Sequence, residues 1–367
     1  MALTHPDGTH HERLLYEESE LLHRLSSIRQ QLNHLTPISK LPPEILSHVF
    51  SFCVTHPYSR TLAKNTLAFT QACRTWRTLA LSTSKLWSTI DICHARHAEL
   101  CLSRSGGASL SVIAPISVMA FERPGSLVGA RNRIRKIDVV MFPESMLRLF
   151  KQMIMGLDSK ESHDEVVLGS SSSLGMGTNA TSTLVLENLT QLNLRLPSIV
   201  ERADLSFLRI PSIQKLSLDS VNLDWMSIAD DIRNRNRGLK ALSLSTLTIS
   251  MHELIALIEQ SEEVFLEDLH VPDYEDGIYG VSPLSLRTMT IVSKNQAFVD
   301  ALLSRLTLPS TTEVVLRYRD IRVSGAQAQA RAALAAAIKD GAGHWSVQYG
   351  VSSDVMAMLG YPFPVTG

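Results

Sequence analysis

A leucine-based motif that returns at nearly constant spacing constrains the fold of this 367-residue chain more than any other feature. The pattern L-x-x-L-x-L occurs four times, and its second apolar positions are 24, 26 and 27 residues apart. Looser copies begin at Ile134 and Leu286. The alternation of apolar residues predicts a short strand in each copy. The four copies are Leu189-Leu192-Leu194, Ile213-Leu216-Leu218, Leu239-Leu242-Leu244 and Leu266-Leu269-Val271.

Stretches with apolar residues at helical spacing lie between the predicted strands. They read PESMLRLFKQMI, DWMSIADDIRN, MHELIALIEQ and QAFVDALLSRL. A strand followed by a helix in a unit of about 20–29 residues is the signature of leucine-rich repeats, whose units stack into a curved solenoid with parallel strands. The copies are degenerate, because the asparagine that normally follows the strand is mostly missing and Asn222 is the nearest candidate. A doubly wound parallel sheet is the alternative, although no glycine-rich turn follows any predicted strand.

We assign the α/β solenoid to residues 93–367. Its C-terminal part is expected to cap it. A last strand is predicted at Glu313–Tyr318, and an alanine-rich helix at Gly325–Asp340 would cover it. The residues from Trp345 to Gly367 would then form an atypical cap. Within the solenoid, residues 168–183 are rich in Ser and Gly, which predicts a flexible insertion.

The N-terminal residues divide into a polar stretch, 1–11, which we expect to be disordered, and a helix over residues 12–36. The apolar residues of this helix are spaced 4, 3, 4 and 3 apart, which is a heptad pattern. Self-association through a coiled coil is one interpretation. A helix folded back on the rest of the chain is the other, and we favour it because only about two heptads are regular. The residues concerned are Leu21, Leu25, Ile28, Leu32 and Leu35.

Residues 37–92 predict a small helical module. Pro42 and Pro43 precede Glu44, and prolines and a carboxylate both suit the first turn of a helix. The apolar residues Ile45, Leu46, Val49 and Phe50 then form a wide stripe, and a second helical pattern, broken once, covers Leu62–Leu81. About fifty residues can barely bury their own apolar surface, so this module is expected to pack against a neighbour.

Four elements of this module, in this order, resemble the F-box family. They are Leu41-Pro42-Pro43-Glu44-Ile45-Leu46, Val49-Phe50, Cys73-Arg74-Thr75-Trp76 and Leu86-Trp87. F-box modules of this kind behind an N-terminal helix look most like those of mushroom-forming fungi. The resemblance implies an all-α fold and a partner, because F-boxes dock substrate receptors onto the Skp-type adaptor of a cullin-RING (SCF-type) ubiquitin ligase.

Carried over residue by residue, the resemblance implies that the adaptor-binding residues are Leu41, Pro42, Ile45, Leu46, Val49, Phe50, Cys73, Trp76 and Trp87. The chain would then be a substrate receptor in the cytoplasm or nucleus, and the solenoid would hold a protein substrate of unknown identity. One departure is the connection Thr55–Thr66, which is longer than usual and lacks the acidic–leucine start of the second helix. It motivates the alternative that the chain is a non-catalytic binding scaffold whose F-box-like helices only cap the solenoid.

No motif in the sequence predicts a catalytic or cofactor site. Cys93, His97 and Cys101 are spaced i, i+4 and i+8, and thiolates with imidazoles are zinc ligands. Zinc sites usually draw their ligands from two segments, so a packed helix face is the preferred interpretation, and we expect no metal or cofactor. His252 and Glu253 lack the second histidine of an HExxH motif. The chain is therefore expected not to be an enzyme.

Three basic clusters are candidates for substrate binding, because the guanidinium group binds carboxylates and phosphates with two hydrogen bonds. They contain Arg131 and Arg133, Arg233 and Arg235, and Arg317 and Arg319. Surface pairing with nearby acids is the simpler interpretation. The net charge of −1 argues against nucleic-acid binding. The longest apolar run, from Leu110 to Phe121, is too short to span a membrane, and the four cysteines form no CxxC pair, which favours a reducing compartment.

Overall fold

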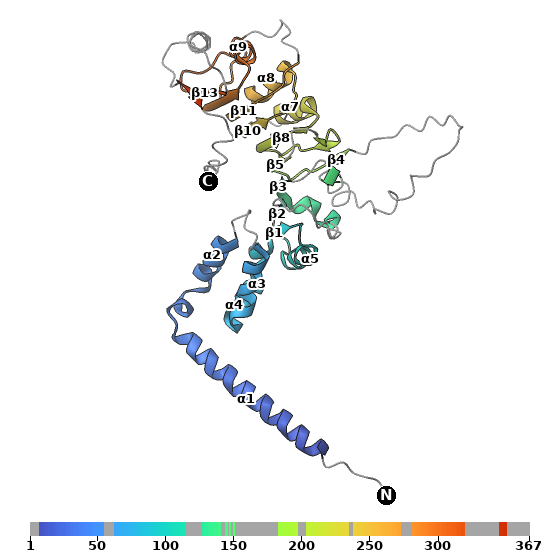
Figure 1. Cartoon of the computed structure of the whole chain (residues 1–367), viewed down its shortest axis with the longest axis vertical. Helices are drawn as coiled ribbons and strands as arrows, with labels where there is room; N and C mark the ends of the chain where they lie inside the picture. The colour runs from blue at the N-terminus through green and yellow to red at the C-terminus, as the bar shows by residue number, and fades with distance from the viewer. Residues whose placement is uncertain are drawn as a thin grey trace, which may run out of the picture. The chain divides into compact units, whose positions relative to one another are not determined.

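The computed structural model describes residues 7–54, 62–114, 127–140, 144–145, 147, 150, 183–196, 203–234, 238–272, 280–319 and 345–350. The chain divides into two compact units. The first contains residues 1–89 and 100–108, and the second contains residues 90–99 and 109–367. Figure 1 shows helices at the N-terminal end of the chain and alternating strands and helices in the remainder.

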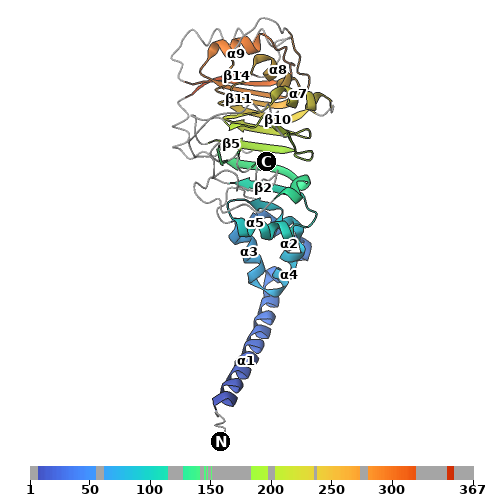
Figure 2. The ribbon, with the colours of Figure 1, turned by 90° about the vertical axis from the view of Figure 1, so that its right-hand side faces the viewer.

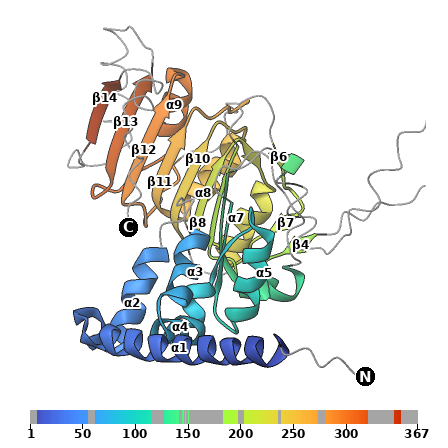
Figure 3. The same ribbon diagram turned by 60° about the horizontal axis from the view of Figure 1, so that its bottom comes forward.

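The first unit is helical, as predicted. Its elements are α1 (Asp7–Leu35), η1 (Pro37–Lys40), α2 (Pro43–Val54), α3 (Leu62–Ala72), α4 (Arg74–Ser82) and η2 (Ser84–Trp87). Helix α1 begins at Asp7, so part of the stretch expected to be disordered is helical, and it ends one residue before Thr36. The hydroxyl of Thr36 donates to the carbonyl oxygen of Asn33 at 2.7 Å. Figure 3 shows α1 together with the three helices that follow it.

The second helical pattern begins at Leu62, as predicted, which shortens the connection before it. Helix α3 begins at Leu62, and so the last five residues of the predicted connection Thr55–Thr66 are helical. Residues 55–61 lie outside the described part of the chain. The single predicted break in the second helical pattern lies at Cys73, between α3 and α4.

The second unit is built on a ten-stranded sheet in which the spatial order of the strands follows the order of the chain (Figure 2). Every strand pair whose register is described is parallel. A doubly wound sheet would reverse its strand order at a switch point, and this sheet does not. The fold is therefore α/β and leucine-rich-repeat-like. The strands are β1 (Thr89–Asp91), β2 (Leu110–Ala114), β3 (Ile134–Val140), β5 (Gln191–Arg195), β8 (Lys215–Asp219), β10 (Leu239–Ser245), β11 (Ser261–Glu267), β12 (Thr288–Ser293), β13 (Glu313–Arg319) and β14 (Trp345–Gly350).

Two apolar rows run across this sheet and form the core of the second unit. One row passes through Leu192, Leu216 and Leu242, and the other passes through Leu194, Leu218 and Leu244. Each of these side chains is buried, and both rows continue into the neighbouring strands. Since side chains alternate between the two faces of a strand, the residues between the rows lie on the opposite face.

Helices cover the face that carries the apolar rows. They include α7 (Trp225–Asn234), α8 (Met251–Glu259) and α9 (Gln296–Leu303), which agree closely with the predicted helical stretches. Helix α8 contacts β11, and α9 contacts β12. The start of α8 has a capping box, in which the Ser250 hydroxyl accepts from the Glu253 backbone N–H and the Glu253 carboxylate accepts from that of Ser250.

The residues predicted for the fourth copy of the repeat, Leu266-Leu269-Val271, were wrong. Strand β11 pairs Val264 with Leu242 and Leu266 with Leu244, so Leu266 takes the third position of the motif and not the first. The first position belongs to Ser261, which is fully buried and whose hydroxyl donates to the carbonyl oxygen of Leu257 at 2.6 Å. The internal hydrogen bond satisfies the hydroxyl and lets a serine occupy a position where the pattern predicts a leucine.

Short turns with an unusual backbone conformation end three successive strands. Ser220, Thr246 and Asp268 follow β8, β10 and β11, and their φ angles are 59°, 50° and 45°. Residues other than glycine seldom adopt positive φ. Each of the three donates its backbone N–H to the last or next-to-last residue of the following strand. The recurrence of one turn at one place in successive units is what stacked repeats require.

The remaining predictions have mixed outcomes. The strand predicted at Glu313–Tyr318 is confirmed as β13, and part of the expected cap, Trp345–Gly350, is one more parallel strand. The alanine-rich segment 325–340 and nearly all of 168–183 lie outside the described residues. Among the described residues, no helix is both long and apolar enough to cross a membrane.

Candidate functional site: the exposed face of the helical module

The interior of the helical module is an aromatic cluster. The ring of Phe50, on α2, stacks on that of Phe69 with centroids 4.2 Å apart and an interplanar angle of 9°. Trp76 meets the Phe50 ring edge-on at 5.0 Å. The sulfur of Cys73 accepts from the Trp76 backbone N–H at 3.5 Å and caps the start of α4. The CxxW motif thus begins a helix and directs its tryptophan against α2.

Another aromatic residue is buried at the C-terminal end of the module. Trp87 is fully buried, and its indole Nε1 donates to the carbonyl oxygen of Ala80 at 2.8 Å. The guanidinium carbon of Arg104 lies 4.5 Å from the centre of the Trp87 ring, a cation–π arrangement. Leu86 beside it is also buried. The leucine–tryptophan pair that ends the sequence motif therefore belongs to the core of the module.

One face of α2 and the turn before it remains exposed and apolar. Leu41, Ile45, Val49 and Phe52 are spaced 4, 4 and 3 residues apart, which places them along one side of the helix. All four are exposed, with 51% of Ile45 and 72% of Phe52 accessible. Monomeric proteins rarely leave a contiguous apolar row of this kind open, so the row is a candidate interaction surface. We call these four residues the α2 face.

The structure separates the nine predicted adaptor-binding residues by exposure. Four are exposed, two are half-buried and three are buried. The exposed ones are Leu41, Pro42, Ile45 and Val49, the half-buried ones are Cys73 and Trp76, and the buried ones are Leu46, Phe50 and Trp87. The buried side chains support the α2 face from inside and are not available to a partner in the folded module. Phe52 was missed, although its position seven residues after Ile45 places it on the same helical face.

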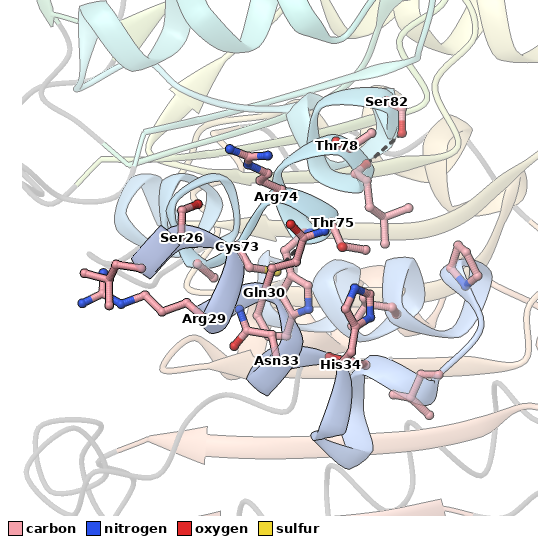
Figure 4. A pocket seen from close by; sticks show the side chains of 18 of the residues that line it. Ser26, Arg29, Gln30, Asn33, His34, Cys73, Arg74, Thr75, Thr78 and Ser82 are labelled. Carbon is pink, nitrogen blue, oxygen red and sulfur yellow. Dashed lines mark hydrogen bonds between the residues drawn. The ribbon is translucent and has the colours of Figure 1, made fainter. Parts of the chain in front are cut away.

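A pocket of about 740 Å³ lies between α1, η1, α2 and α4. Leu22, Leu25 and Leu79 are among its apolar lining residues. Figure 4 shows Arg29 on α1 and Arg74 on α4 among its polar ones. Among the described residues that line the pocket, none is an aspartate or glutamate. One side of α1 therefore faces the helical module across this pocket.

The residues considered as zinc ligands lie in and just before one helix. Helix α5 covers Ala95–Arg104, so Cys93 lies before the helix that carries His97 and Cys101. Burial, with the nearby Asp91 carboxylate, raises the pKa of the Cys93 thiol to about 12, and burial lowers the pKa of His97. Burial thus disfavours the charged form of both groups. The part of the chain that the structure describes contains no group of three or more His, Cys, Asp or Glu residues arranged to hold a metal ion.

The first and third basic clusters lie at different places along the sheet. Arg131 and Arg133 belong to η3 (Val128–Arg133), just before β3, whereas Arg317 is exposed on β13. The sheet order places six strand spacings between β3 and β13, roughly 29 Å. Arg233 lies at the end of α7, 3.8 Å from Asp230 and 3.9 Å from Glu259. Arg235 and the side chain of Arg319 lie outside the described residues.

The comparison with protein families agrees with the geometry of the helical module. Residues 38–93 match the family model of the F-box-like domain. No curated protein and no solved structure matches the chain significantly. The matched segment covers most of η1 and all of α2, α3, α4, η2 and β1. These elements contain the aromatic cluster of Phe50, Phe69 and Trp76, the buried Trp87 and the α2 face. The chain thus carries an F-box-like domain, followed by an α/β region with parallel strands.

Proposed function

We propose that this protein is a substrate-recognition adaptor of an SCF-type cullin-RING ubiquitin ligase, with the F-box-like domain binding a Skp-type adaptor. The observation that carries this proposal is the α2 face. The domain encloses its own aromatic core, so the four exposed apolar residues are not needed to complete the fold. Burying them against a partner would stabilise the complex by the hydrophobic effect.

The sequence elements of the F-box then have two different roles. Leu41, Pro42, Ile45, Val49 and Phe52 contact the adaptor directly. Phe50 and Trp87 keep α2 in place, because their rings fill the interior behind it. Cys73 and Trp76 lie half-buried, so they orient α4 and contribute only their accessible edges.

The α/β region would hold the protein substrate on the sheet face opposite the apolar rows. This face carries polar side chains, including Asp138, whose carboxylate accepts from the amide of Asn193 at 2.9 Å and lies 3.4 Å from the ammonium of Lys136. Arg317 lies on the same face and is exposed, which makes it the strongest of the predicted substrate contacts. Holding a substrate near the transfer enzyme accelerates ubiquitin transfer through proximity, so the chain itself performs no catalysis. Such a receptor acts in the cytoplasm or nucleus.

The scaffold alternative requires the F-box-like helices to use their apolar surface inside the chain. Within the helical unit itself Ile45 and Phe52 remain exposed, so the unit does not cover its own apolar face. The connection that motivated this alternative is also shorter than Thr55–Thr66, because α3 begins at Leu62.

Co-purification tests the proposal. The tagged full chain is expressed with a Skp-type adaptor and a cullin, and we expect both to co-purify with the wild type. The double variant Ile45→Glu and Val49→Glu should lose them, because a carboxylate on the α2 face would be buried without a partner. Met226→Glu, at an exposed apolar residue on α7, is the matched control and should retain them. A wild-type chain that captures no adaptor, or a double variant that captures as much as the control, would refute the proposal.

A further inference from the structure

Helix α1 carries a second apolar row, which is distinct from the α2 face. The row extends the heptad predicted for Leu21–Leu35 back to Leu14, and only Glu18 interrupts it. Every apolar member is exposed, including Leu21 with 66% of its surface accessible. Most of the stability of a helix in a protein comes from the packing of its apolar face, so this helix of 29 residues is stabilised when the row is covered. The members are Leu14, Leu21, Leu25, Ile28, Leu32 and Leu35, and we call them the α1 row.

The α1 row is not the side of the helix that faces the F-box-like domain. The pocket between α1 and the domain is lined from α1 by Leu22, Ser26, Arg29 and Asn33, among others. At 3.6 residues per turn, these positions lie roughly a quarter of a turn or more from the centre of the row. Leu25 is the one member that also borders the pocket. The F-box-like domain therefore leaves most of the α1 row uncovered.

The charges on α1 are unevenly distributed and indicate what covers the row. Residues 7–20 contain Asp7 and four glutamates with a single arginine and two histidines. Residues 21–35 contain Arg24, Arg29 and two histidines and have no acidic residue. An antiparallel copy of the same helix would place each acidic half beside a basic half. A parallel copy would place like charges together and would bring Glu18 of both copies to the same layer of the seam.

We propose that two copies of this protein associate through their α1 rows as an antiparallel helix pair. The pairing buries the heptad row of each helix against that of the other, and the opposite charges of the two halves select the antiparallel orientation. The pair would present two F-box-like domains and two α/β regions in one assembly. This inference stands independently of the adaptor, because it uses none of the α2 face.

Analytical ultracentrifugation of the full chain tests the association. We expect the wild type to sediment as a dimer that dissociates on dilution, and the variant Leu21→Glu with Leu32→Glu to sediment as a monomer. The control is Leu284→Glu, which changes an 88% exposed leucine outside α1 and should leave the dimer intact. A wild type that stays monomeric at every concentration, or a row variant that stays as dimeric as the control, would overturn the proposal. Because α1 is exposed along its length, the row variant should keep the fold of both units, which circular dichroism can check.

Charge reversal tests the orientation. Replacing Arg24 and Arg29 with Glu gives a helix that is acidic throughout. In an antiparallel pair this change converts attractions into repulsions, and the dissociation constant should rise roughly tenfold or more. In a parallel pair, the basic halves already repel one another, and so the same change would not weaken the dimer.

A distance measurement gives an independent answer about orientation. A spin label at Arg13→Cys would lie about 30–40 Å from its counterpart in an antiparallel pair, but roughly 10–15 Å away in a parallel one. The exposed Cys53 is replaced by Ser in both samples, and the parent without the Arg13→Cys change reports any label on the remaining cysteines. The short distance would overturn the antiparallel arrangement.

Discussion

Phe50 and Phe52 lie two residues apart on α2, and the structure predicts opposite consequences for replacing them. Phe50 is 1% exposed and contacts the rings of Phe69 and Trp76, whereas Phe52 is largely exposed. A phenylalanine buries roughly 150–250 Å². At about 25 cal/mol per Å², Phe50→Ala should destabilise the helical unit by about 4 kcal/mol, which agrees with measured costs of about 3–5 kcal/mol for such changes. Phe52→Ala should change the free energy of unfolding by less than about 0.5 kcal/mol.

Urea unfolding followed by tryptophan fluorescence measures both changes, because Trp76 and Trp87 report on this unit; Trp225 and Trp345, in the second unit, are replaced by Phe in every sample. A stability of about 0.05–0.15 kcal/mol per residue gives a unit of roughly 100 residues about 5–15 kcal/mol, so Phe50→Ala removes between about a quarter and four fifths of it. Phe52→Ala should weaken adaptor binding although the domain remains folded, because Phe52 lies on the α2 face. Equal destabilisation by the two variants would refute the division between interior and α2 face.

Three further predictions concern the same fold. Cys73→Ala should lower the free energy of unfolding by about 1 kcal/mol because α4 loses its N-cap, whereas Cys73→Ser should retain the cap; chemical denaturation measures both. Leu242→Ala, at the centre of an apolar row, should destabilise the second unit by about 3 kcal/mol, while Ser243→Ala on the opposite face should cost less than about 0.5 kcal/mol, and thermal unfolding distinguishes them. Burial lowers the pKa of His97, so the unfolded chain binds that proton more tightly and stability should fall as the pH decreases through about 6.5. His97→Gln should remove this part of the pH dependence in unfolding experiments at a series of pH values, and an unchanged pH profile would contradict it.

Much of the fold could be predicted because it depends on repeated apolar spacing. Leu192, Leu216 and Leu242 lie in neighbouring strands at the same level, as their spacing required. The prediction failed at Ser261, where a hydrogen-bonded serine replaces the first apolar residue of the unit. A leucine pattern does not reveal this position, because Ser261 is buried only with the hydrogen bond from its hydroxyl to the carbonyl oxygen of Leu257.

The candidate site was predicted less completely. A motif shows which residues occur together, but it does not show which of them point inward. Ile45 and Phe50 belong to the same apolar stripe, yet one lies on the surface and the other in the core. The aromatic contacts with Phe69 and Trp76 decide this difference, and they depend on the packing of three helices. The basic clusters, likewise, could not be related to one another before the strand order was known.

Calorimetric titration of a purified Skp-type adaptor into the full chain and into its Ile45→Glu variant tests the central claim most directly. Ile45 is half exposed in the free protein, so the variant should unfold like the wild type, and any loss of affinity belongs to the α2 face. We expect the wild type to bind and the variant to bind at least about tenfold more weakly, because binding would bury an unpaired carboxylate. A wild type that releases no heat of binding in any buffer and shows no complex by sedimentation, or a variant that binds as tightly as the wild type, would contradict the account.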